Sequence, residues 1–188
     1  MTAGHPPARH GRGLRLLHWA TAVLVLAQVL LAALNRLLYE PRPILAEWLV
    51  QAHLSGGAAL LAVVALRLGV RLGARGTLAP PVRTGLPWLA TATHVALYAC
   101  LLVLPILGYI RLAALGFQIE LFGLLSLPPT RLDPQLARAA ATAHTTVAAL
   151  LGGLVTLHVA GAALHRRLFG TDVLKRMTLK LGKRDGRA

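Results

Sequence analysis

Four long apolar stretches dominate this sequence and limit the folds open to it. They cover Leu14–Leu34, Trp48–Val70, Trp88–Ile110 and Ala139–Leu164. Each is close to the roughly 20 apolar residues that a helix needs to cross a bilayer core about 30 Å thick. Of the 188 residues, 56% are hydrophobic and only 14% are charged, which is the composition of a membrane protein. We therefore expect an all-α, integral membrane four-helix bundle, because only internal hydrogen bonds satisfy the backbone in lipid.

The basic residues are distributed unevenly between the two ends of such a bundle. Three precede the first stretch, four lie around the second connection and eight follow the last stretch, which leaves five on the opposite side. By the positive-inside rule this distribution places both termini in the cytoplasm. The net charge of +14 is therefore attributed to basic residues on the cytoplasmic side of the membrane. Nucleic acid is not expected as a partner.

The sequence divides into one domain with two basic ends. Residues 1–13 are expected to form a mobile N-terminus, residues 14–170 the four-helix domain, and residues 171–188 a cytoplasmic tail. The first apolar stretch is too long for a signal peptide and is interpreted as a retained span. The segment Ala113–Leu127 is apolar but too short to cross the bilayer, so it is predicted to lie along the outer surface.

Three histidines on the last stretch indicate a ligand-binding face. His144, His158 and His165 are 14 and then 7 residues apart, so they project from one stripe of one helix. Imidazoles inside a lipid-length helix are costly unless something binds them. Their position predicts iron as the ligand.

Span direction assigns a depth to each histidine. With the N-terminus inside, His53 and His144 lie near the outer face, whereas His18 and His158 lie near the cytoplasmic face. Each pair is predicted to hold one haem between two helices. His94 also fits the inner depth, and spacing alone leaves it open as a ligand.

Glycines lie beside these histidines. Gly56 and Gly57 follow His53 by three and four residues, and Gly161 follows His158 by three. Missing side chains at these positions leave room for a flat macrocycle, although glycine also serves plain helix packing in membranes.

Two other classes of site, structural zinc and a proton relay, fit these histidines less well than haem. Structural zinc needs four ligands within about 2.0–2.3 Å, and histidines four helical turns apart do not converge on one ion. A transporter with a histidine proton relay is the second alternative, but no acidic residue lies at the centre of a span and the halves show no inverted symmetry. The single cysteine, Cys100, excludes an intrachain disulfide and a C-x-x-C-H haem attachment, and is read as a packing residue.

Five blocks of the sequence resemble the bacterial cytochrome b561 family of four-helix membrane proteins. They are LRLLHWATAVLVL, AHLSGGAALLAVVALRLGVRL, HVALYACLLVLPILGY, GFQIELFGLLSLPP and HTTVAALLGGLVTLHVAGAALHRRLFGTDVLKRM. Together they cover most of residues 14–177, and the last block is the most specific.

The resemblance implies two haem b groups and electron exchange with ubiquinone in the bacterial inner membrane. The family's axial haem ligands correspond to His18, His53, His144 and His158. His165 corresponds to a position implicated in quinone binding, with the loop around Arg75 as a helper. Where family members usually carry a further histidine, this chain has Arg166.

The resemblance leaves the electron donor open. Some members oxidise superoxide and reduce ubiquinone, whereas others link a hydrogenase or dehydrogenase partner to quinone. The chain is thus either a superoxide:ubiquinone oxidoreductase or an electron-transfer cytochrome, acting as a homodimer or with a partner redox subunit. Arg111, Arg131 and Arg138 supply a cationic outer patch for a small anionic donor, or are simply solvated surface charges.

Overall fold

The computed structural model describes residues 11–73, 87–128, 130 and 133–169, which form four long helices and one short hairpin. The helices are α1 (Arg12–Leu38), α2 (Pro43–Gly73), α3 (Pro87–Ala114) and α4 (Pro134–Phe169). The strands β1 (Ile119–Leu121) and β2 (Leu125–Leu127) lie between α3 and α4. All four helices are long and apolar enough to cross a membrane. The predicted all-α four-helix membrane fold is confirmed.

Proline sets where three of the helices begin. Pro43, Pro87 and Pro134 each occupy the first position of a helix. This position suits proline because its fixed φ is helical and its missing N–H has no partner to lose there. α1 begins at Arg12, so the last two residues of the expected mobile N-terminus, Arg12 and Gly13, are helical instead. Residues 1–10 and the expected tail, residues 171–188, lie outside the described residues.

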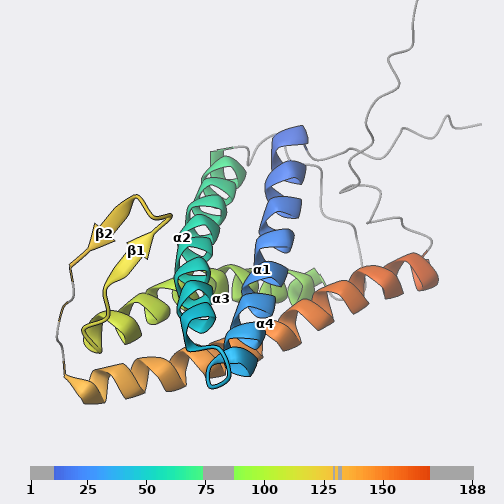
Figure 1. Ribbon diagram of the computed structural model, residues 1–188. Coiled ribbons are helices and arrows are strands. Elements are labelled where there is room, and N and C mark those ends of the chain that lie inside the picture. The colour runs from blue at the N-terminus through green and yellow to red at the C-terminus, as the bar shows by residue number, and fades with distance from the viewer. Residues whose placement is uncertain (1–10, 74–86, 129, 131–132, 170–188) are drawn as a thin grey trace, which may run out of the picture.

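The helices pack as two pairs, α1 with α2 and α3 with α4, which meet through α2 and α3. In Figure 1 the two pairs cross one another. The core where they meet contains Leu60, Val64, Cys100, Leu101, Leu104 and Leu151. Cys100 is only 6% exposed, which confirms its interpretation as a packing residue.

The outward faces of the helices are apolar. On α1, the side chains of Leu26, Val29 and Leu30 are 69%, 64% and 58% exposed. Such continuous apolar exposure is expected where lipid, and not water, surrounds the helices.

The connection between α3 and α4 has a structure that the sequence did not predict. β1 and β2 pair antiparallel, with Ile119 opposite Leu127 and Leu121 opposite Leu125. Phe122 and Gly123 have φ values of 56° and 66°, as in the type I′ turns that match the twist of a hairpin. Ile119 is 2% exposed, because β1 packs against α2. The segment is thus a hairpin docked on a helix.

Candidate functional site

The structure brings His53 of α2 and His144 of α4 together. Their ring centroids are 6.3 Å apart and the ring planes are inclined by 62°. This is the pair that depth matching placed at the outer level.

A backbone carbonyl orients the ring of His144. Its Nδ1 lies 3.0 Å from the carbonyl oxygen of Leu104 on α3. A carbonyl oxygen only accepts hydrogen bonds, so Nδ1 carries the proton and Nε2 keeps its lone pair. Gly108, one turn further along α3, faces the same ring: a Cβ there would lie 3.4 Å from Cε1 of His144. The ring is therefore held in a close-fitting place with Nε2 available as a metal ligand.

A side-chain amide lies beside His53. One end of the Gln28 amide, on α1, is 2.8 Å from Nδ1 of His53. Gln28 is a polar residue in the middle of the first apolar stretch, which was the signal that could have drawn attention to it in the sequence.

Three imidazoles meet at the level of His158, which the sequence predicts to be the inner one. His18 of α1 and His158 of α4 have ring centroids 6.3 Å apart, with planes inclined by 72°. His94 of α3 is closer to His158, at 5.2 Å. Nδ1 of His94 lies 2.7 Å from the carbonyl oxygen of Ala90, within its own helix.

The two ring-centroid distances of 6.3 Å fit an intervening haem better than the 5.2 Å between His94 and His158. A bond from a metal to an imidazole nitrogen is about 2.0 Å, so two opposed axial rings with an iron between them have centroids roughly 6 Å apart. The pairs His53–His144 and His18–His158 match this spacing. The 5.2 Å between His94 and His158 is short for it. Among the described residues, no group of three or more His, Cys, Asp or Glu side chains is arranged to hold a bare metal ion.

Two arginines lie near the level of His18 and His158, although their charge alone marked them only as basic residues of the predicted cytoplasmic side. Arg15 is 7% exposed and precedes His18 by one helical turn. Arg67 lies inside α2, with Cζ 5.5 Å from the ring centroid of Tyr98, in a cation–π contact. Their spacing was the available signal, since Arg67 follows His53 by 14 residues and so shares its stripe of α2.

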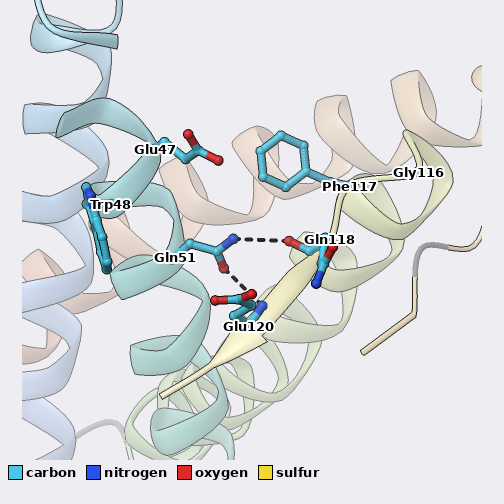
Figure 2. A pocket seen from close by; sticks show the side chains of 7 residues that line it. All are labelled: Glu47, Trp48, Gln51, Gly116, Phe117, Gln118 and Glu120. Carbon is cyan, nitrogen blue, oxygen red and sulfur yellow. Dashed lines mark hydrogen bonds between the residues drawn. The ribbon is translucent and has the colours of Figure 1, made fainter. Parts of the chain in front are cut away.

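A cleft of about 470 Å³ lies between α2 and the hairpin (Figure 2). It is lined by Glu47, Trp48, Gln51, Gly116, Phe117, Gln118 and Glu120. The amide of Gln51 donates to the carbonyl oxygen of Gln118 at 3.0 Å and accepts from the backbone N–H of Glu120 at 3.1 Å. Since Gln51 precedes His53 by two residues, the cleft lies at the level of the His53–His144 pair.

Not every predicted site residue can be placed. Arg75 and Arg131 lie outside the described residues. For His165 only the helical backbone is described, and it continues α4 two turns beyond His158. A Cβ on Gly57 or Gly161 would meet nothing within 4 Å, whereas a Cβ on Gly56 would meet the side chain of Gln28.

Comparison with known proteins agrees with this arrangement. The family model for prokaryotic cytochrome b561 matches residues 9–180, which is most of the chain. No curated protein gives a significant match. The family implies haem b binding and membrane electron transfer, which suits four membrane-length helices with imidazoles facing one another between them. The chain belongs to the prokaryotic cytochrome b561 family.

Proposed function

We propose that this cytochrome binds two haem b groups and passes electrons between a donor on the outer face and quinone in the membrane. The observation that carries the proposal is the repetition of one geometry: two histidine pairs, each with ring centroids 6.3 Å apart, at two levels of α4, one formed with α2 and the other with α1. Along α4 the two levels are separated by about 21 Å, since His144 and His158 are 14 residues apart at 1.5 Å per residue.

Each level has its own ligands in this proposal. His53 and His144 hold the outer haem, and His18 and His158 hold the inner haem. The bound haems supply one-electron oxidation and reduction. The chain supplies the axial imidazoles, their orientation and a lipid-facing exterior that keeps water from the iron. Arg67, which lies within electrostatic reach of His158, offers positive charge beside the inner level, where haem carboxylates need a partner.

The experiment that tests the proposal is a haem count on the purified full chain. We expect about two haems per chain with a low-spin, bis-histidine b-type spectrum in both redox states. One haem per chain, or a high-spin spectrum at either site, would contradict the proposal of two axial pairs.

His165 and the loop around Arg75 are proposed to bind the quinone at the inner end of α4. His165 is two turns beyond His158 on the same stripe, about 10 Å further along the helix axis, which is too far to share that iron. An imidazole at that depth is suited to hydrogen-bond a quinone headgroup. His94 is the alternative if His165 has no effect.

Superoxide is a specific candidate for the outer donor. The supporting observation is that Arg111 lies within electrostatic reach of both His53 and His144, so an anion is attracted toward the outer pair. Glu47 and Glu120, which line the cleft beside α2, repel an anion from that side. Stopped-flow mixing of the isolated chain with superoxide distinguishes a self-sufficient oxidoreductase, which is reduced rapidly, from a subunit that needs its redox partner.

A further inference from the structure

Gln28 contributes an amide to the interior of the bundle where apolar side chains would be expected. It lies in the middle of α1, is only partly exposed, and reaches across to α2. An amide in a membrane-spanning helix is costly unless its donors and acceptor find partners in the bundle. The position of Gln28 inside the bundle is therefore explained by its hydrogen-bond partners on α2.

The contacts of Gln28 all lie on the helical turn that carries His53. One end of the amide is 2.8 Å from Nδ1 of His53 and 2.9 Å from the carbonyl oxygen of the same residue. The other end is 3.2 Å from the backbone nitrogen of Gly57. Gln28 thus contacts Nδ1 of His53, which is the ring nitrogen that stays unligated when the ring binds a haem through Nε2.

Gly56 makes this approach feasible. A Cβ at position 56 would collide with the amide of Gln28. By contrast, a Cβ at Gly57 or Gly69 of the same helix would meet nothing within 4 Å. The glycine at position 56 is needed to admit the amide, which is a more specific role than general helix packing.

We propose that Gln28 is the positioning residue of His53, and that its contact with Nδ1 fixes the ring orientation of this ligand and thereby adjusts the reduction potential of the outer haem. The inference rests on the proposed axial role of His53. An imidazole bound to iron through Nε2 carries its proton on Nδ1, and the acceptor of that proton tunes the basicity of the ligand.

One orientation of the Gln28 amide satisfies all three of its contacts. With its nitrogen toward His53, it donates to Nδ1 and to the carbonyl oxygen, and its oxygen accepts from Gly57. An iron-bound ring carries its proton on Nδ1, so its bond to Gln28 needs the amide reversed, with its oxygen toward Nδ1. The reversed amide keeps the bond to the ring and gives up the bonds to the His53 carbonyl oxygen and the Gly57 N–H. His144 has the equivalent acceptor in the Leu104 carbonyl, which substitution of a side chain does not remove. Of the two contacts to the Nδ1 atoms of the outer pair, only the one from Gln28 comes from a side chain and can be removed by mutation.

The test is a redox titration of both haems in Gln28→Leu and Gln28→Glu variants of the full chain. We expect Gln28→Leu to raise the potential of the outer haem, because a ring without its acceptor is less basic and stabilises ferric iron less. The expected shift corresponds to a roughly tenfold change in the reduction equilibrium, or about 59 mV for one electron. Gln28→Glu should shift the potential in the opposite direction, and the electron paramagnetic resonance g values of the outer haem should change in both variants.

Two further variants separate positioning from general stability. Gly56→Ala keeps the amide but displaces it, so it should move the outer potential in the same direction as Gln28→Leu. Gln51→Leu removes an amide that bonds the hairpin and not His53, and should leave both potentials unchanged.

The outcomes are distinct for the inference and for the proposed function. If wild-type protein lacks two bis-histidine haems, the proposed function fails. If it has them, and Gln28→Leu keeps both haems with an unchanged outer potential, the role of Gln28 alone is refuted. Loss of both haems in every Gln28 and Gly56 variant would show a folding role instead, and would also overturn the inference.

Discussion

Nδ1 of His144 is bonded to the carbonyl oxygen of Leu104, the residue that precedes Pro105 in α3. The two residues belong to different helices and are 40 positions apart, yet the bond is 3.0 Å long. Because the partner is backbone, the orientation of this ring depends on how α3 packs against α4 rather than on any one side chain. The outer site is thus built into the α3–α4 interface.

We expect His53→Ala and His144→Ala each to lose the outer haem and keep the inner one. Removal of one axial imidazole leaves the iron five-coordinate and weakens its hold on the protein. The haem content should fall from about two to about one per chain, measured as the pyridine complex against protein concentration. Retention of two haems in either variant would show that the outer pair is assigned wrongly.

The inner level offers a choice between two partners for His158. We expect His18→Ala to lose the inner haem and His94→Ala to keep both, because only the 6.3 Å pair suits an intervening iron. The same haem count, combined with the low-spin spectrum, decides the case. The opposite result would assign His94 and His158 as the inner ligands.

Gly108 should tolerate alanine but not a large side chain. A Cβ at this position makes ordinary contact with the ring of His144, whereas the branches of leucine would need the space that the ring occupies. We expect Gly108→Ala to retain both haems and Gly108→Leu to lose the outer one. Gly69→Leu is the matched control, since its position on α2 is open. Equal behaviour of the two leucine variants would argue against steric support of His144.

His165→Ala is expected to keep both haems and to slow quinone reduction. The side chain is proposed to contact the quinone headgroup and not iron, so the haem spectrum should be that of the wild type. Reoxidation of the reduced protein by a soluble ubiquinone analogue should slow by about tenfold, as for loss of one hydrogen bond of roughly 1.4 kcal/mol. Wild-type kinetics in this variant would direct attention to His94.

If superoxide is the outer donor, Arg111→Gln should slow haem reduction several-fold at low salt. The arginine lies within electrostatic reach of the outer histidines, and its attraction for an anion weakens as ionic strength rises. Stopped-flow rates for wild type and variant should therefore converge in high salt. A difference that is independent of salt would mean that Arg111 does not act by attracting the donor.

The sequence predicts correctly those features that depend on the hydropathy and fixed rise of single helices. Hydropathy alone predicts four spans, and the fixed rise of a helix is enough to match His53 with His144 in depth, whereas it leaves both His18 and His94 open as partners of His158. It was less informative where two elements meet. The bond from His144 to Leu104, the contact of Gln28 with His53 and the docking of the hairpin all join residues from different elements. Their partners depend on helix rotation and packing, which composition and spacing do not specify.

The hairpin is fastened to α2 on both sides of a proposed ligand. Gln51 bonds the backbone of β1, and the hydroxyl of Ser55 accepts from the N–H of Phe122 at 2.8 Å, so the two attachment points flank His53. Gln51 and Ser55 are one helical turn apart, and His53 lies on that same turn, facing the bundle. The hairpin is therefore anchored to the same turn of α2 that presents His53 to His144, so a single helical turn sets the place of both the hairpin and the imidazole.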